Sequence, residues 1–160
     1  MNRPKLIVLT GLPAVGKSEA SKILSEEYGY SVLSTDALRK SMFGQDYSEL
    51  KRNGDEEKMR LELIARKLYQ LSEGKDVIID SCAPTDNFRK RMFHVPKRLE
   101  GRIDKIVLYV QSDEELIEER LLTRGGSKEA IETIKRYWED PKDGDGGARL
   151  YRIQNNSGLN

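Results

Sequence analysis

The stretch Gly11-Leu12-Pro13-Ala14-Val15-Gly16-Lys17-Ser18 fits the phosphate-binding loop pattern G-x-x-x-x-G-K-[ST]. Before it, residues 6–9 are Leu-Ile-Val-Leu, a run that favours a strand. After it, residues 19–28 carry apolar side chains at helical spacing, and Gly29 is a typical helix stop. A strand, a glycine-bearing loop and a helix in this order form the context in which the motif binds nucleotide phosphates.

The loop and the helix behind it supply two kinds of ligand for a nucleoside triphosphate. Backbone N–H groups of residues 13–18 would converge on phosphate oxygens at the helix N-terminus, where the helix dipole favours negative charge. Lys17 would bridge the terminal phosphates, and the Ser18 hydroxyl would hold Mg²⁺. The alternative, a tight turn that binds nothing, is less favoured in this context. We therefore predict ATP and Mg²⁺ as cofactors and a nucleotide site made of Gly11, Leu12, Pro13, Ala14, Val15, Gly16, Lys17, Ser18 and Glu19.

Length and composition indicate one domain over residues 1–160. The formal net charge of +1 indicates no global field for nucleic acid or membranes, although a local basic surface stays open. Cys82 is the only cysteine, which excludes an intramolecular disulfide and favours a reducing compartment. No stretch approaches the ~20 apolar residues of a membrane span. We expect a soluble cytoplasmic protein without a membrane partner, and the oligomeric state stays open.

Strand-like and helix-like stretches alternate along the chain and predict an α/β fold with a parallel sheet covered by helices on both faces. The expected strands are residues 5–10, 30–34, 76–80, 103–110 and, at an edge, 150–153. The expected helices are residues 17–28, 36–43, 56–72, 84–95, 112–124 and 127–139. Residues 45–54 look like a mobile connection, and the order of residues 140–160 stays open. Ligands of such sheets bind beyond the carboxyl ends of the strands.

Two residues after the second strand are candidates for an acceptor site. Asp36 and Arg39 are three apart on an expected helix, so that a carboxylate and a guanidinium share one face. A kinase needs a carboxylate that orients or deprotonates the attacking hydroxyl, and Asp36 suits that role. The alternative is that Thr35 or Asp36 is only the helix N-cap and Arg39 a solvated charge.

Asp80 ends an apolar strand, as does the acidic residue that supports Mg²⁺ in many NTPases, so we predict a metal-linked role for it, through water. It could instead cap the following turn or anchor a basic side chain. Arg120 and Arg124 are four apart on a helix that breaks at Gly125-Gly126. This spacing predicts a helical lid at about residues 120–128 that closes over the triphosphate. The alternative is surface arginines paired with nearby glutamates.

Several single residues are weaker candidates. His94 lies in a basic cluster and is expected on a solvated helix face, although that cluster could receive a polyanionic acceptor. Cys82 is expected to be a small buried residue rather than a nucleophile. Tyr137 is expected to point inward, and Tyr137 and Trp138 to pack in the core and at its edge. Asn155 and Asn156 are positioned late in the chain, where they could border the nucleotide base.

With these motifs in place, residues 5–139 resemble the small P-loop kinases grouped with the kinase domain of polynucleotide 5′-hydroxyl kinases and with zeta toxins. The matching motifs are residues 11–18, 34–39, 77–80 and 120–125. The resemblance implies a three-layer P-loop NTPase sandwich of about five parallel strands in the order 2-3-1-4-5. Departures are Ala14-Val15 where many members have Gly-Ser, and Glu19 where many have Thr.

The resemblance also implies roles for individual residues. Asp36 would be the general base, Arg39 would bind a phosphate of the acceptor, and Arg120 and Arg124 would contact the donor phosphates. With Lys17 these residues make the expected catalytic set of Lys17, Asp36, Arg120 and Arg124. The implied function is an ATP- and Mg²⁺-dependent kinase acting on a polynucleotide 5′-hydroxyl. The alternatives are a small-molecule kinase for a sugar, nucleotide sugar or antibiotic hydroxyl, and a nucleotide-dependent switch without an acceptor.

Overall fold

The structure is a computed structural model that describes residues 2–44 and 54–156. Strands and helices alternate along the chain, as expected, and each strand of the sheet is separated from the next by at least one helix. The elements are β1 (Lys5–Thr10), α1 (Lys17–Tyr28), β2 (Ser31–Ser34), α2 (Thr35–Phe43), α4 (Asp55–Ser72), β3 (Val77–Asp80), α5 (Asp86–Phe93), β4 (Asp104–Gln111), α6 (Glu114–Thr123), α7 (Lys128–Lys135), the short 3-10 turn η1 (Asp145–Gly147) and β5 (Arg149–Gln154).

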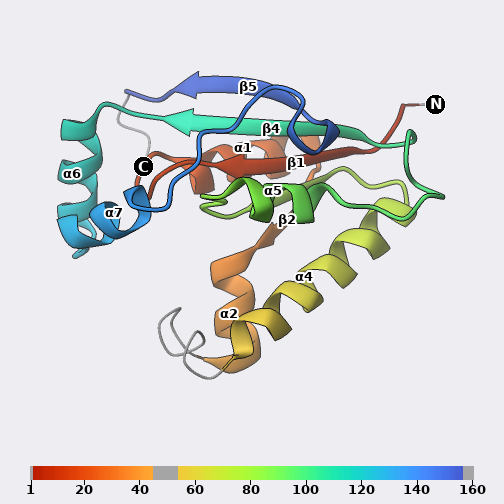
Figure 1. Ribbon diagram of the computed structural model, residues 1–160, viewed down its shortest axis with the longest axis horizontal. Helices are drawn as coiled ribbons and strands as arrows, with labels where there is room; N and C mark the ends of the chain where they lie inside the picture. The colour runs from red at the N-terminus through yellow and green to blue at the C-terminus, as the bar shows by residue number, and fades with distance from the viewer. Residues whose placement is uncertain (1, 45–53, 157–160) are drawn as a thin grey trace.

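The five strands form one parallel sheet in the order β2-β3-β1-β4-β5, which confirms the expected fold class and strand order. Strand β1 is central: Ile7 pairs with Ile78 of β3 on one side and with Ile106 of β4 on the other. Strand β5 is the edge strand beside β4, in the position expected for residues 150–153 (Figure 1). Because the phosphate-binding loop follows the central strand, the loop lies in the middle of the carboxyl-end rim.

Alternating side chains of β1 point to opposite faces of the sheet and build two cores. Leu6 and Val8, both fully buried, belong to the core under α4 and α5, which supply side chains that include Met59 and Phe93. Ile7 and Leu9 belong to the opposite core, against which Leu24 of α1 packs. A helix layer on each face makes the predicted three-layer sandwich, and the central strand is buried on both sides, which explains its unbroken apolar sequence.

Two helix caps differ from the expectation. The N-cap of α2 is Ser34, whose side chain accepts from the Ala37 backbone N–H at 3.2 Å, rather than Thr35 or Asp36. Residues 112–115, Ser-Asp-Glu-Glu, have the pattern of a capping box and predict one at the start of α6, but this prediction is wrong, because no side-chain cap bond forms at the N-cap Asp113. The Ser112 hydroxyl bonds to the carbonyl oxygens of Val15 and Asn155 instead. Because Ser34 caps α2, the Asp36 carboxylate is not used as the helix cap.

The last expected helix is shorter than its apolar pattern suggests. Helix α7 ends at Lys135, so that Tyr137 lies beyond it with 44 % of its surface exposed, and the expectation that Tyr137 points inward is wrong. Residues 141–154, whose order the sequence left open, contain η1 and β5. The expected mobile connection falls largely on residues 45–53, which lie outside the described residues, as do residues 157–160. In the described part of the chain, no helix has the length and apolarity needed to cross a membrane.

Candidate active site

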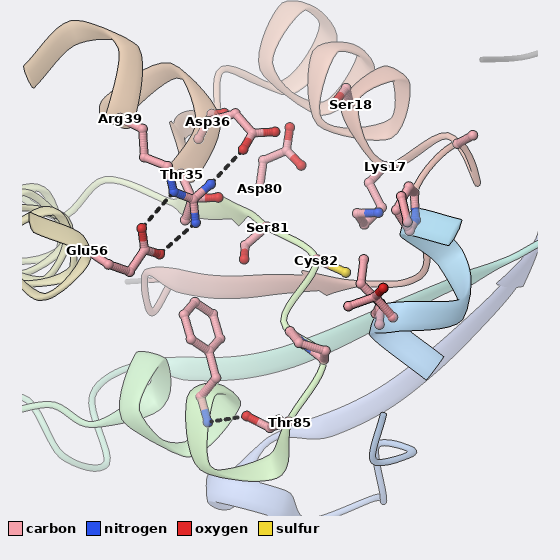
Figure 2. A pocket seen from close by; sticks show the side chains of 18 of the residues that line it. Lys17, Ser18, Thr35, Asp36, Arg39, Glu56, Asp80, Ser81, Cys82 and Thr85 are labelled. Carbon is pink, nitrogen blue, oxygen red and sulfur yellow. Dashed lines mark hydrogen bonds and ion pairs between the residues drawn. The ribbon is translucent and has the colours of Figure 1, made fainter. Parts of the chain in front are cut away.

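A cavity of about 670 Å³ opens at the carboxyl ends of β1, β2 and β3. One end is lined by the phosphate-binding loop and by residues of α7, and the other by side chains of α2, α4 and α5. Figure 2 shows Lys17 and Ser18 on one side of this space and Asp36, Arg39 and Glu56 on the other, with Asp80 and Ser81 between them. The cavity therefore has a phosphate end and a second end that could receive an acceptor.

The loop conformation requires its glycines. A Cβ atom at Gly11 would lie 2.5 Å from the Val110 carbonyl oxygen and 2.9 Å from the Val15 side chain, so only glycine fits there. Gly16, the N-cap of α1, has a φ of 102°, which favours glycine. Ala14 also has a positive φ, 65°, although it carries a side chain. This left-handed conformation costs about 1–2 kcal/mol for an L-residue, so surrounding contacts must hold it in place.

Lys17 folds back over the loop that it belongs to. Its ammonium donates to the carbonyl oxygens of Gly11 at 2.8 Å and Leu12 at 2.7 Å. Burial lowers the pKa of Lys17, and the nearby Cys82, Asp80 and Asp36 oppose that shift. A triphosphate at the loop would give this ammonium negatively charged partners. Of the predicted loop residues, Pro13, Ala14, Gly16, Lys17 and Ser18 line the cavity, whereas Gly11, Leu12, Val15 and Glu19 do not line it.

Ser18 and Asp80 fit the donor set of a magnesium site. The Asp80 carboxylate is hydrogen-bonded by the hydroxyls of Ser18 and Ser21, the latter at 3.3 Å. Burial raises the pKa of Asp80, and the Lys17 charge and the serine hydroxyls oppose that shift. Among the described residues no group of three acidic, histidine or cysteine side chains could hold a metal alone. Mg²⁺ typically takes one or two protein ligands and completes its shell with phosphates and water, so this sparse set suits it.

Asp36 and Arg39 do come together, but with a third residue that the sequence did not indicate. Arg39 Nη1 donates to Asp36 at 2.6 Å, and Arg39 Nε and Nη2 donate to the two carboxylate oxygens of Glu56 at 2.9 and 2.7 Å. Glu56, at the start of α4, is buried, whereas the Asp36 side chain is 87 % exposed. Arg39 thus connects an anchored carboxylate to an accessible one, and it holds Asp36 at the mouth of the cavity.

The two predicted lid arginines lie in different environments. Arg124 is exposed and lines the cavity. Arg120 is buried and does not line the cavity; it donates to the Ala14 carbonyl oxygen at 3.3 Å, to Ser112 Oγ at 3.0 Å and to the Asn155 carbonyl oxygen at 3.3 Å. Arg120 therefore faces the loop backbone rather than the cavity in this structure, and its contact with the donor phosphates stays a prediction.

Side chains from distant parts of the chain hold the loop carbonyls of Ala14 and Val15. Arg120 bonds to the first, while Ser112 and the Asn155 side-chain amide bond to the second, at 3.4 and 2.9 Å. Asn155 therefore supports the loop backbone and does not line the cavity that would hold a nucleotide. Because these carbonyls are held on the α6 side, their contacts support the strained φ of Ala14 and fix the loop shape that phosphate binding needs.

Sequence reasoning missed most of the second end of the cavity. Glu56 and Arg60 of α4, and Phe88 and Arg91 of α5, line it, as do Thr85 and Asn87 nearby. Ser81, directly after Asp80, had a signal in its position at a strand's carboxyl end, and Arg91 belongs to the basic cluster around His94 for which a polyanionic acceptor was left open. Cys82 is half-buried, lines the cavity and donates to the Gly11 carbonyl oxygen at 3.2 Å. Burial raises the pKa of its thiol, which disfavours a nucleophilic role as expected. His94 is exposed at the end of α5.

Comparison with known proteins places this geometry in context. A family model described as "AAA domain" matches residues 6–143. The chain is 29 % identical over 126 residues to a protein of Thermococcus gammatolerans named "Putative adenylate kinase", covering 79 % of this chain and 60 % of that protein. It is 28 % identical over 141 residues to L-seryl-tRNA(Sec) kinase of Methanococcus maripaludis, covering 84 % of this chain and 51 % of that protein. The chain thus spans only about half to three fifths of these relatives.

Among solved structures, a protein of Chloroflexus aurantiacus described as a "putative kinase" superposes with a TM-score of 0.73 at 24 % identity. The match covers 96 % of this chain and 86 % of that protein. At this level of identity the likeness concerns the fold, and it agrees with the strand order described above.

Proposed function

This chain belongs to the AAA domain family whose model matches residues 6–143, and we propose that it is an ATP- and Mg²⁺-dependent kinase that phosphorylates a hydroxyl group. The observation that carries the proposal is the shared cavity: Asp36, accessible and held by Arg39, lines the same space as the phosphate-binding loop. A nucleotide switch without an acceptor needs the loop but has no use for a positioned carboxylate opposite it.

The proposed reaction uses residues with distinct roles. Loop N–H groups and Lys17 bind the triphosphate, and Arg124, which lines the cavity, adds positive charge near it. Ser18 and Asp80 are the residues that would hold Mg²⁺, which neutralises charge on the phosphates when bound. The acceptor oxygen forms a bond to the γ-phosphorus while the bond from that phosphorus to the bridging oxygen breaks. The hydroxyl proton passes to Asp36, and ADP leaves.

Relatives support the donor side of this proposal more than the acceptor side. Their names describe acceptors as different as an adenylate and a seryl-tRNA. The polynucleotide 5′-hydroxyl implied by the resemblance is therefore one proposed acceptor, and small-molecule hydroxyls are the alternative. Since Arg39 is already paired with Glu56 and Asp36, the acceptor phosphate contact that the resemblance implies for Arg39 would require those pairs to rearrange.

The test is transfer of labelled γ-phosphate from ATP with Mg²⁺ to a 5′-hydroxyl oligonucleotide and to a panel of sugars, sugar acids and nucleosides. Asp36→Asn removes the base but keeps a similar shape, and we expect its turnover to fall by about 10²-fold or more while ATP still binds. Asp104→Asn is the matched control, because Asp104 begins β4 at the opposite end of the sheet and does not line the cavity.

Near-normal turnover in Asp36→Asn would contradict the assignment of the base. ATP consumption that is independent of every added acceptor, and unchanged in Asp36→Asn, would favour the switch. Label on the oligonucleotide alone would support the polynucleotide acceptor, and label on small molecules alone would move the acceptor while keeping the mechanism.

A further inference from the structure

The end of the cavity away from the phosphate-binding loop carries two arginines from different helices. Arg60 of α4 and Arg91 of α5 both line the cavity. Both pair with one carboxylate, Glu57, which does not line the cavity: Arg60 Nη1 lies 3.6 Å from Glu57 Oε2, Arg91 Nη1 lies 3.1 Å from the same oxygen, and Arg91 Nη2 contacts Oε1. Two guanidiniums and one carboxylate leave this cluster with a net positive charge.

Arg60 is also held from another direction. Its guanidinium carbon lies 5.9 Å from the centroid of the Phe88 ring, within the range of a cation–π contact. Its Nε is buried and has no hydrogen-bond partner among the described residues. A buried donor without a partner is costly, by about 1–3 kcal/mol, so this Nε needs a partner such as a water molecule or a bound anion.

The neighbouring arginine, Arg39, does not offer the same opportunity. Its three donor nitrogens serve the two carboxylates of Asp36 and Glu56, so that this triad carries a net negative charge. The second end of the cavity is thus divided: a negative part beside the proposed base, and a positive part with an aromatic wall formed by Arg60, Arg91 and Phe88. An acceptor with a hydroxyl at one end and an anion at the other would match both parts.

We propose that Arg60 and Arg91 form an anion-binding subsite, and that the acceptor is a hydroxyl compound that carries a phosphate or carboxylate group away from the reacting hydroxyl. The anion binds between the two guanidiniums and partly replaces Glu57, and the adjoining carbon skeleton packs on Phe88. This inference rests on the proposed kinase function, because it names the class of acceptor for the same cavity. A planar guanidinium can bind either a phosphate or a carboxylate, because both anions present two oxygens to its paired N–H groups.

The first experiment compares acceptors that share a hydroxyl and differ in an anion: thymidine 3′-monophosphate against thymidine, and gluconate against its uncharged open-chain counterpart sorbitol. A 5′-hydroxyl oligonucleotide is included as an anionic polymer. In the wild-type protein we expect kcat/KM to be at least about 10-fold higher for the anionic member of the accepted pair. Arg60→Gln and Arg91→Gln should each abolish most of that ratio by raising KM, and Arg60→Lys should keep part of it.

Two further variants separate this role from a merely structural one. Glu57→Gln removes the internal competitor, so its preference for the anionic acceptor should increase several-fold. Arg66→Gln is the matched control, because Arg66 is on the same helix, pairs with Glu62 at 2.8 Å and does not line the cavity. It should leave the ratio unchanged. A structural role for the arginines would not predict a gain in Glu57→Gln.

A binding measurement keeps the inference separable from the kinase proposal. With ADP and Mg²⁺ saturating, thymidine 3′-monophosphate should raise the melting temperature of the wild-type protein and should have no effect on Arg60→Gln. If no acceptor is phosphorylated but this shift is present, the kinase proposal fails and the anion site stands. The kinase proposal stands and the inference is wrong if acceptors are phosphorylated but the wild type has nearly equal kcat/KM for the anionic and the uncharged acceptor. The same conclusion holds if the preference for the anionic acceptor is unchanged in Arg60→Gln and in Arg91→Gln.

Discussion

Lys67 offers a quantitative test of how α4 and α5, the two helices of the proposed acceptor end, are held together. This side chain of α4 is fully buried, and its ammonium donates to the carbonyl oxygens of Met92 and His94 at the end of α5, both at 2.8 Å. Burial lowers the pKa of Lys67 to about 8, and the positive charge of Lys105 contributes in the same direction. The folded protein therefore loses this proton far more easily than the unfolded chain does.

The sign of the effect on stability follows from proton counts. Below about pH 8 both states hold the Lys67 proton, and the free energy of unfolding does not depend on pH through this group. Between about 8 and the ordinary value of 10.5 the unfolded chain still holds a proton that the folded state has lost, so stability rises with pH. A difference of this size corresponds to a rise of about 3 kcal/mol over the window.

The assay is urea unfolding between pH 7 and 10.5 for the wild type and for Lys67→Met. Raised pKa values of Tyr30, Tyr109 and Cys82 make stability fall over the same range, but these groups are present in both proteins. The difference between the two pH profiles therefore isolates Lys67. Lys67→Met leaves two carbonyls without their donor and should be less stable at pH 7, and the difference between the profiles should increase by about 3 kcal/mol towards high pH.

Lys67→Gln keeps a hydrogen-bond donor but cannot ionise, so its free energy of unfolding should also lack the rise between about pH 8 and 10.5. This variant replaces Lys67→Met in the assay if the methionine variant does not fold. Lys58→Met, at an exposed position of the same helix, should keep the wild-type profile. Parallel profiles for the wild type and both Lys67 variants would refute the reasoning, because they would mean that the Lys67 ammonium is not desolvated by folding.

Three predictions concern the loop. Arg120→Met should raise the dissociation constant for ATP about 10-fold or more, because the Ala14 carbonyl loses its charged donor; equilibrium binding measures it, and unchanged affinity would contradict the positioning role. Ala14→Gly should change the free energy of unfolding by less than about 1 kcal/mol, because relief of the positive φ offsets the lost methyl contacts and the greater freedom of unfolded glycine. Ala14→Val places a branched side chain at this positive φ and should lower the free energy of unfolding by about 2 kcal/mol or more, measured by urea unfolding. An unchanged free energy of unfolding would contradict the strain argument.

Much of the fold could be predicted because its signals are local. The loop pattern, the apolar strand before it and the helix after it lie within about two dozen consecutive residues, and Gly16 with its positive φ is part of this short unit. The carboxyl-end rule predicted that Ser18, Asp36, Asp80 and the residues after Val110 lie at one rim. The first three line the cavity together with Lys17 and Arg124, whereas the residues directly after Val110 do not line it.

The remainder of the site depends on contacts between residues far apart in the chain. Arg120 and Arg124 have the same chemistry and helical spacing in the sequence, yet one is buried against Ala14, 106 residues away, and the other is exposed at the cavity. Helix packing decides which face of α6 is covered, and no local pattern contains that information. The same holds for Glu56, which meets Arg39 only because α4 packs against α2.

The phosphate-binding loop, the alternation of strands and helices and the rim where polar residues gather can all be read from the sequence, since backbone propensity and side-chain periodicity act over short distances. Which charged side chains pair with one another depends on how the helices pack in the folded protein. In the folded protein Arg39 lies between two carboxylates, Arg120 donates to the Ala14 carbonyl of the loop, and Arg60 and Arg91 share Glu57 at the cavity. The electrostatic interactions of a charged side chain depend on its burial and on the groups beside it, and packing sets both.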